Sequence, residues 1–473
     1  MFGIIHATID RANRCALRFV VKTDALSAFL VGNKIYIHIA RVLFHVCINR
    51  SNGWVIPLTL EASSIGKLPF CAALVYGVVR TLGFACTAID AFICNHYGHD
   101  VTVVSGCNVK FGAKIRTHMT NTFKSGLVQL GQWFRGELPG RGGDDADLLS
   151  TAEGQNRWFT SDFVRMALHA NGTMLDPLTL DRWTGEYPEL SMERKPQRIG
   201  LVLAGNLPMV GWHDILCVLM SGHCAVIKCS SSDGILIPAA IEALQGFVGK
   251  LDLVDRVEFV SGQLGSLDAV IATGSANSNR YFEYYFRALP KVLRSQRTSA
   301  AVLLGTETDD ELRALGADVF NYYGMGCRSV TKLFLPTGFD LDRLFAVWVD
   351  WAHVANNNKY ANNYDYHKAV WLLNQYQLIE NGFVLLKQDD GWFSPVGTLY
   401  YDFYDDLSDV SEALEHHADS IQCVATSDRD ALGMLASPIV ALGQTQCPAP
   451  WEYADGIDTL SFLLALSSSP VAR

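Results

Sequence analysis

Short apolar segments alternate with longer helical segments from Arg198 onward, and this alternation limits the fold of the chain more than any other feature. Each short segment has the length of a β-strand. Apolar strands that alternate with helices form a parallel sheet covered by helices on both faces, a doubly wound α/β arrangement. The first block predicts strands at 199–204, 225–229, 257–260 and 268–272, and helices at 210–221, 235–248 and from 276 through 287.

Residues 298–440 repeat this alternation. The repetition predicts a second domain of the same class. Its expected strands are 300–304, 330–335, 381–387 and 395–404, and its expected helices are 309–323 and 407–416.

Three polar loops follow predicted strands of the first block, at 205–206, 228–232 and 273–275. Ligands of doubly wound sheets bind at the carboxyl ends of the strands, so these loops are candidates for a binding site. No Gly-x-Gly-x-x-Gly sequence is present, and an ordinary Rossmann fingerprint is therefore not indicated.

One cysteine stands in a setting that suits chemistry. Cys327 follows Gly324 and Gly326, which let the backbone turn sharply, and it precedes an apolar, β-prone run. Arg328 is next to it and Lys332 is five residues on. Nearby positive charge lowers the pKa of a thiol, and the thiolate is the nucleophile. The alternative is a buried cysteine beside a turn, because free cysteine is among the most buried residue types.

The chain divides into four parts by composition and pattern. Residues 1–120 carry 12 Lys/Arg against five Asp/Glu, in a chain of net charge −10, and they hold six of the 12 cysteines. They are expected to be an extension outside the core, whether an added small domain, a membrane-surface segment or sequence upstream of the true start. The other parts are 121–297, with N-terminal helices at 124–135 and 161–170 before the first sheet, 298–440, and a C-terminal segment at 441–473.

Composition argues against several classes of protein. A net charge of −10 without a long basic run argues against a nucleic-acid partner. The cysteines show no Cys-x-x-Cys pair, so we expect neither a metal site nor a disulfide scaffold, and a reducing cytoplasm is the default location. The apolar run 68–93 is interrupted by Arg80 and Asp90, and neither arm reaches the roughly 20 residues that span a bilayer. No transmembrane segment is therefore predicted.

Four motifs, in order, resemble the LuxC-type acyl-CoA reductases, a family of the aldehyde dehydrogenase superfamily. They are LAGNLPMVGWHD at 203–214, YGMGCRSVTK at 323–332, NNYDY at 362–366 and ADGIDTL at 454–460. The resemblance covers about 125–466 and leaves 1–120 unexplained. It implies an aldehyde dehydrogenase-like fold of two doubly wound parallel-sheet domains, with an atypical N-terminal extension. The domain at 121–297 would bind the cofactor, and the domain at 298–440 would carry the nucleophile.

The resemblance also implies a reaction. An acyl thioester, such as a fatty acyl-CoA or an acyl carrier, would be reduced to an aldehyde by NADPH or NADH. Cys327 would attack the thioester carbonyl and hold the acyl group as an enzyme thioester. Charge builds on the carbonyl oxygen in both steps, so hydrogen-bond donors must already point there. The backbone N–H of Cys327 and the amide of Asn206 are the expected pair; the alternative for Asn206 is a role as a turn residue.

The cofactor contacts implied by the resemblance fall on two loops. Lys228 would meet the adenosine ribose or a 2′-phosphate there, with Ser230 beside it, unless it is a solvated lysine at a strand end. Thr273, Gly274 and Ser275 match a loop near the pyrophosphate and the nicotinamide. This loop also opens a helix, whose free N–H groups suit phosphate. NADPH is preferred over NADH in this reading, and homo-oligomerisation is left open.

Two further positions bear on the mechanism. His213, in the first motif, is either an acid–base group or a hydrogen-bonded structural histidine. Aldehyde dehydrogenases that hydrolyse their thioester carry a glutamate in a Glu-Leu-Gly-Gly motif before the cysteine. The corresponding segment is expected at 301–305 and holds no acid, which fits a reductase because a water-activating base would waste the acyl-enzyme. Glu307 lies close by in sequence and is not expected to replace it.

Three alternative functions remain. An acylating aldehyde dehydrogenase would use the same residues to convert an aldehyde to acyl-CoA. A non-redox acyl-transfer protein would hold the acyl group on Cys327 and pass it on, and binding of NADPH separates it from a reductase. A pseudoenzyme would use its N-terminal extension for interaction, which removal of 1–120 tests.

Overall fold

The computed structural model describes six strands within residues 3–62, and then residues 120–138, 145–248, 253 and 255–466. The chain divides into two compact units, Met1–Ala113 and Lys114–Arg473. The apolar run at 68–93, for which no transmembrane segment is predicted, lies outside the described residues. In the first unit, β1, β2, β5 and β6 form an antiparallel sheet, and β3 and β4 pair separately. These strands are β1 Gly3–Ala7, β2 Leu17–Thr23, β3 Ala28–Val31, β4 Lys34–Ile37, β5 Val42–Ile48 and β6 Thr59–Ala62.

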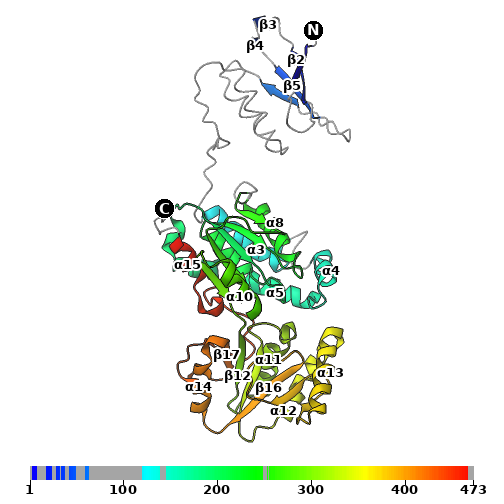
Figure 1. The fold of residues 1–473 in the computed structure, drawn as a ribbon, viewed down its shortest axis with the longest axis vertical. Helices are drawn as coiled ribbons and strands as arrows, with labels where there is room; N and C mark the ends of the chain where they lie inside the picture. The colour runs from blue at the N-terminus through cyan, green and yellow to red at the C-terminus, as the bar shows by residue number, and fades with distance from the viewer. Residues whose placement is uncertain are drawn as a thin grey trace. The chain divides into compact units, whose positions relative to one another are not determined.

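The second unit contains two α/β domains (Figure 1). The sheet of the first domain is wholly parallel, with strand order β11-β10-β7-β8-β9. Its strands are β7 Arg198–Val202, β8 Cys224–Lys228, β9 Val257–Phe259, β10 Ala269–Thr273 and β11 Lys291–Arg294. Its helices are α3 Asn121–Phe134, α4 Ala146–Gln155, α5 Ser161–Met174, α6 Pro177–Gly185, α7 Trp212–Met220, α8 Leu236–Val248 and α10 Ala276–Tyr285.

Burial explains why these segments form the first domain. The middle residues of β7, β8 and β10 are fully buried, as expected for strands covered on both faces. Eight of the nine residues of α7 are buried, and His213 is the exception. This helix is therefore central in the domain rather than amphipathic at its surface. The N-cap of α5 is Thr160, whose hydroxyl accepts from the N–H of Phe163, and the expectation that Ser161 caps this helix is wrong.

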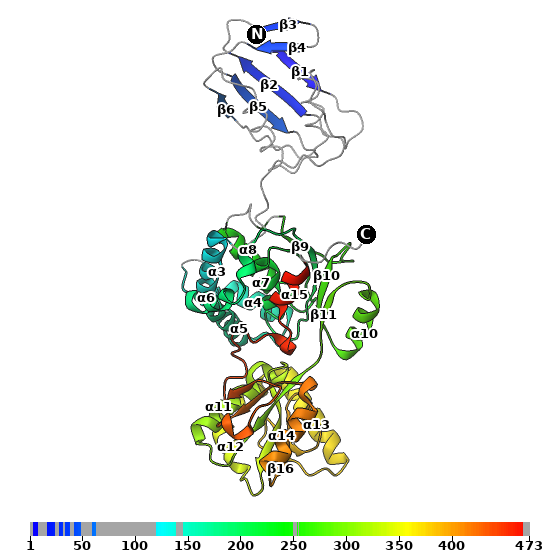
Figure 2. The ribbon, with the colours of Figure 1, turned by 90° about the vertical axis from the view of Figure 1, so that its left-hand side faces the viewer.

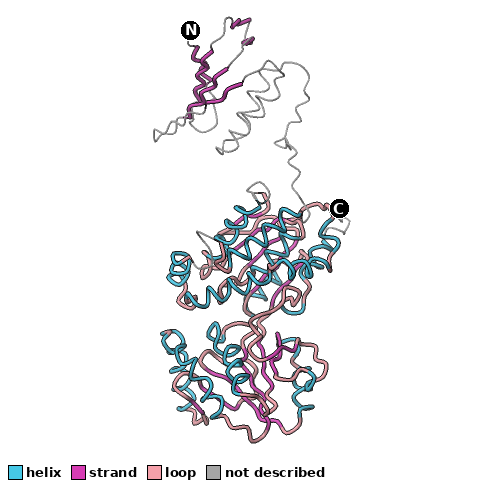
Figure 3. Tube along the Cα trace, turned by 180° about the vertical axis from the view of Figure 1, so that it is seen from behind, coloured by secondary structure: helices cyan, strands magenta, loops and turns pink. Residues whose placement is uncertain are grey.

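The second domain holds a seven-stranded sheet of order β14-β15-β16-β13-β12-β17-β18, parallel except for the β14–β15 pair. Helices lie on both sides of this sheet (Figure 3). The strands are β12 Thr298–Val302, β13 Val330–Pro336, β14 Ile379–Glu380, β15 Leu385–Gln388, β16 Thr398–Tyr404, β17 Ile421–Thr426 and β18 Ile439–Ala441. The helices are α11 Asp309–Phe320, α12 Asp342–Trp348, α13 Asn358–Leu373 and α14 Leu407–His416, with short 3₁₀ turns that include η2 Asn321–Gly324 and η3 Val349–Asn356.

The C-terminal segment returns to the first domain. Helix α15 (Thr459–Leu466) packs on α7, as Figure 2 shows, and its Leu460 and Leu463 are fully buried in the same core. The ring of His223 donates to the carbonyl of Leu463 at 2.9 Å. Residues 454–466 are therefore structurally part of the first domain, although they follow the second in sequence.

A buried ion pair connects this segment to the first sheet. Arg294, at the end of β11, donates to both carboxylate oxygens of Asp214 in α7. The same guanidinium donates to the carbonyl of Ala454 at 2.7 Å and to the hydroxyl of Thr459 at 2.9 Å. A buried pair with this many hydrogen bonds fixes one arrangement of its elements, because breaking it would leave an uncompensated charge.

A chain that begins at Thr120 is expected to fold and to be about as active as the full chain. The second compact unit begins at Lys114, and the Thr120 hydroxyl caps α3 by accepting from the N–H of Phe123 at 3.1 Å. Thermal unfolding and reductase assays of the two proteins, side by side, check this. A shortened protein that is folded yet inactive would show that residues 1–119 complete the active site.

Candidate active site

Cys327 lies in a reversal of the chain between η2 and β13. Tyr322, Tyr323 and Gly324 have φ angles of 53°, 57° and 72°, so three successive residues are left-handed. This conformation is costly for tyrosine and persists only where packing enforces it. Phe163 of α5 supplies such packing, with ring centroids 5.2 Å from Tyr322 and 4.9 Å from Tyr323. The helix predicted at 309–323 therefore ends at residue 320, and the reversal leaves Cys327 exposed to solvent.

Hydrogen bonds fix the turn around the cysteine. The N–H of Gly326 donates to Ser329 Oγ at 3.1 Å, and the N–H of Ser329 donates to the Gly326 carbonyl at 3.0 Å. The hydroxyl of Ser299, in β12, donates to the carbonyl of Cys327 at 3.1 Å. Within the described ranges, the backbone N–H of Cys327 has no acceptor apart from its own sulfur. It is therefore available to a group bound at the thiol.

The loop of Asn206 contacts the loop of Cys327. The side-chain amide of Asn206 donates to the carbonyl of Met325 at 3.2 Å. A Cβ at Gly326 would lie 3.0 Å from Leu207 Cδ1, so the two loops approach each other closely here. The structure thus brings together, from two domains, the two residues expected to supply the oxyanion donors. Their roles in catalysis remain predictions.

Charged groups near the thiol act in both directions. Cys327 is exposed, yet protein surrounds it at longer range, and this burial raises the pKa of its thiol. The guanidinium of Arg328 is the strongest influence that lowers this pKa. The carboxylate of Asp455 raises it, and Arg294 lowers it. Arg328 is therefore the main source of thiolate stabilisation, but burial outweighs it, and the expectation that nearby positive charge leaves the pKa of Cys327 lowered is wrong.

Lys332 does not act on the thiol, and that expectation is wrong. Lys332 points inward from β13, and its side chain is buried. Its ammonium donates to the backbone carbonyl of Asp389. Burial lowers the pKa of Lys332. Thr331 donates to the carbonyl of Trp392, so both residues anchor the 389–397 loop.

The ring of His213 is engaged on both sides. Its Nε2 donates to the Pro450 carbonyl at 2.8 Å, and its Nδ1 faces Cys217 Sγ at 3.9 Å. It stacks on Trp183 with centroids 5.1 Å apart. Burial lowers the pKa of His213, which keeps the imidazole neutral. This geometry favours the structural role over acid–base catalysis.

The predicted cofactor residues share one edge of the first sheet. In the parallel register Val202 pairs with Lys228, and Ala272 pairs with Val202, so the carboxyl ends of β7, β8 and β10 are level. Lys228 ends β8, and its ammonium donates to the Gly262 carbonyl at 3.1 Å. Ser230 lies against the Asn206 loop, because a Cβ at Gly205 would come within 2.5 Å of its hydroxyl oxygen.

The second cofactor loop opens a helix at the same edge. Thr273 ends β10, and Ser275 caps α10 by accepting from the N–H of Ser278 at 3.3 Å. A Cβ at Gly274 would lie 2.8 Å from the Cβ of Ser278, so the close turn requires glycine. A lysine and a helix N-terminus at one sheet edge fit a phosphate-bearing dinucleotide.

No acid faces Cys327 from the start of β12. Strands β12 and β13 are parallel, and Cys327 adjoins their amino ends through Ser299. The segment 301–305 lies toward the other end of β12, so the expected correspondence with a hydrolytic motif is wrong in position. The segment beside Cys327 is 295–299, with sequence SQRTS, and it also lacks an acid. The absence of an acid therefore concerns residues 295–299 and not residues 301–305.

Glu307 is a structural residue. It is buried beyond the carboxyl end of β12, where its carboxylate accepts from the N–H groups of Leu304 and Gly305 at 2.6 and 2.9 Å. The hydroxyl of Ser427 donates to it at 3.0 Å. Extended chain of about 16 Å separates this end of the strand from Ser299.

Three residues near the thiol escaped the sequence analysis. Ser299 and Arg294 act from the preceding strands, and Asp455 acts from the C-terminal segment. Asp455 is itself constrained, because it accepts from the N–H of Ser295 and forms an ion pair with Arg297 at 3.3 Å. Only Asp455 had a signal in sequence, since it lies within the fourth motif.

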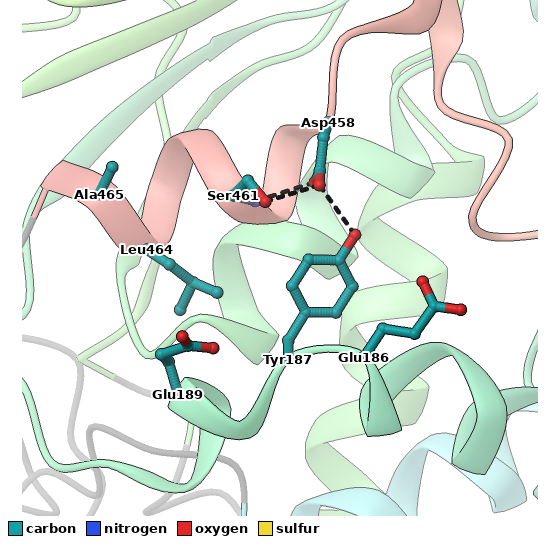
Figure 4. Close-up of a pocket in the computed structure, with 7 residues that line it drawn as sticks. All are labelled: Glu186, Tyr187, Glu189, Asp458, Ser461, Leu464 and Ala465. Atoms are coloured by element: carbon teal, nitrogen blue, oxygen red, sulfur yellow. Dashed lines mark hydrogen bonds between the residues drawn. The ribbon is translucent and has the colours of Figure 1, made fainter.

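A cavity of about 460 Å³ lies away from these residues, beside α15 (Figure 4). None of the predicted site residues lines it. Its walls carry three carboxylates and a tyrosine whose hydroxyl donates to Asp458 at 3.0 Å. Over the described part of the chain, no three His, Cys, Asp or Glu side chains are placed to hold a metal ion. Among the described helices, none is both long and apolar enough to cross a membrane.

Comparison with solved structures identifies the fold as that of aldehyde dehydrogenases. Aldehyde dehydrogenase 21 from Physcomitrella patens, in complex with succinate, aligns with a TM-score of 0.54 and 10% identity, over 75% of this chain and 85% of its own. NADP-dependent glyceraldehyde-3-phosphate dehydrogenase from Bacillus halodurans, complexed with NADP, aligns with a TM-score of 0.50 and 14% identity, over 68% and 77%. No protein-family model matches the chain, and no curated protein does. The predicted fold class is confirmed, and the resemblance to LuxC-type reductases rests on the four motifs.

Proposed function

We propose that this protein reduces an acyl thioester to an aldehyde with NADPH or NADH, through an acyl group held on Cys327. The observation that carries the proposal is the contact between the Asn206 loop and the Cys327 loop. It supports a site in which a nucleophile and an oxyanion donor act on the same carbonyl. The aldehyde dehydrogenase fold, with its NADP-bound neighbour, supports a nicotinamide cofactor at the sheet edge of Lys228 and Ser275.

The chain's own groups account for the first step. The Cys327 thiolate, favoured by Arg328, attacks the carbonyl carbon of the acyl-CoA, and the carbonyl oxygen becomes an oxyanion. The backbone N–H of Cys327 and the amide of Asn206 donate to that oxygen. The bond to the CoA sulfur then breaks, CoA leaves as its thiolate, and the acyl group stays on Cys327.

The second step uses the same donors. When bound, the nicotinamide supplies a hydride to the acyl carbon. The oxyanion forms again in the same place, the bond to Cys327 breaks, and the aldehyde leaves. The segment 295–299 offers no base to activate water, and Asp455 is held by Arg297 and Ser295, which supports reduction over hydrolysis.

The experiment that tests this function follows cofactor absorbance and aldehyde while the full chain is incubated with acyl-CoAs of different length and NADPH. Equal loss of NADPH and gain of aldehyde supports the proposal. A reaction seen only from aldehyde, CoA and NADP⁺ would favour the acylating dehydrogenase. Acyl transfer without loss of NADPH would contradict a redox role.

Lys228→Ala is expected to raise the KM for NADPH about tenfold while leaving kcat nearly unchanged, because one charge-assisted hydrogen bond to the cofactor is lost. Initial rates at varied NADPH and saturating acyl-CoA measure this. Lys195→Ala is the matched control, since Lys195 is an exposed lysine of the same domain. An unchanged KM in Lys228→Ala would show that this lysine is only a solvated strand end.

A further inference from the structure

A buried carboxylate outside the catalytic motifs holds the C-terminal segment that contacts the Cys327 turn. Asp318, in α11, is completely buried. Its Oδ2 accepts from the N–H of Gly443 at 2.6 Å, and its Oδ1 accepts from the N–H and hydroxyl of Thr445 at 3.0 and 2.7 Å. Gly443 is left-handed at φ 80°, and a Cβ there would meet Ala314 of the same helix at 2.8 Å. Residues 443–446 are thus bound closely to α11.

The 443–446 segment in turn contacts both residues that follow Cys327. The guanidinium of Arg328 donates to the Thr445 carbonyl at 3.4 Å and to the Glu452 carbonyl at 3.3 Å. The side-chain amide of Gln446 donates to Ser329 Oγ at 3.3 Å. That same oxygen accepts the N–H of Gly326. The 443–446 segment therefore contacts both the turn and the Arg328 guanidinium, which it holds together with Glu452.

We propose that Asp318 is a positioning residue for the nucleophile: it holds residues 443–446 so that Arg328 and the 326–329 turn keep their places beside Cys327. Asp318 does not touch the thiol and acts through Thr445. The role deepens the proposed function, since it concerns the same cysteine. Its test measures thiol reactivity and needs neither substrate nor cofactor.

The charges that act on the thiol make the effect measurable. They are Arg328, which lowers the pKa of Cys327, Asp455, which raises it, and Arg294, which lowers it. Asp455 and Arg294 are held by other partners, whereas Arg328 is held by the 443–452 region. Loosening the 443–446 segment should therefore weaken the Arg328 contribution alone.

Asp318→Asn is the variant that tests the role. Asparagine keeps the shape but turns an N–H₂ toward the donors of Gly443 or Thr445, so one contact becomes a donor–donor repulsion. We expect alkylation of Cys327 by iodoacetamide at pH 8 to slow about threefold to tenfold, with the reactivity profile displaced to higher pH. Peptide mass spectrometry of the full chain separates Cys327 from the other cysteines. Burial raises the pKa of Asp318 to about 6, so profiles recorded above pH 7 keep it ionised in the unmodified protein.

Two comparisons separate positioning from general loosening. Arg328→Gln should slow alkylation at least as much as Asp318→Asn. The double variant Asp318→Asn/Arg328→Gln should be no slower than Arg328→Gln alone, because both substitutions remove the same effect of Arg328 on the thiol. Asp310→Asn, an exposed aspartate of the same helix, is the matched control and should leave the profile unchanged. Additive losses in the double variant, or an unchanged profile in folded Asp318→Asn, would overturn the proposal.

Thr445 gives a second route if Asp318→Asn fails to fold. Thr445→Val removes one donor to Asp318 and should reproduce part of the loss, while Thr445→Ser keeps the hydroxyl and should restore the profile. Equal profiles for valine and serine at 445 would contradict the role. If these reactivity results hold but no acyl group is transferred, the positioning stands and the proposed function fails.

Discussion

Cys327→Ala is expected to abolish acyl labelling and to lower acyl-CoA reduction by a factor on the order of 10⁴ or more, the scale seen when a covalent nucleophile is removed. The turn at 326–329 contains no other sulfur, so the variant removes the proposed nucleophile outright. The fold should be kept, since the residue is exposed and a substitution there changes the free energy of unfolding by about 0.5 kcal/mol or less.

Cys447 provides the control for that variant. It is the other exposed free cysteine of the described ranges, so Cys447→Ala changes a thiol of the same kind. It should leave labelling intact. Radioactive acyl-CoA counts the label in each protein, and label that persists in Cys327→Ala would show that the acyl group is carried elsewhere.

Asn206→Ala should lower kcat about 10²- to 10³-fold, the usual loss for one oxyanion donor. The amide lies at the Cys327 loop, where it donates to the carbonyl of Met325. Affinity for NADPH should hardly change. Steady-state kinetics and a cofactor titration measure the two quantities. A variant that loses NADPH binding but keeps its turnover at saturation would place Asn206 in the cofactor site.

Apolar strands and helices could be predicted from sequence, because burial on both faces leaves a continuous apolar run. The helix predicted at 407–416 agrees with α14 residue for residue. Strand β11 was missed, because Lys291–Arg294 places charged residues at both ends of four. Helix α13 was also missed, since its 16 residues are largely polar and show little periodicity.

The features of the site that the sequence could not predict depend on contacts between residues far apart in the chain. Tyrosine is not a turn former, and the left-handed Tyr322 and Tyr323 are held by packing on the distant Phe163. Lys332 lies five residues from Cys327, but the direction of a strand side chain carries it into the interior. Asp318 and Arg294 act through residues more than a hundred positions away, and no local pattern reports such contacts.

The central claim is that Cys327 carries the acyl group between the two steps. Its most direct test is peptide mass spectrometry of the full chain after incubation with an acyl-CoA alone, followed by addition of NADPH. We predict that the peptide of Cys327 gains the mass of one acyl group, and that NADPH then removes this mass and releases an equal amount of aldehyde. An unmodified Cys327 peptide under conditions where aldehyde is formed would contradict the account.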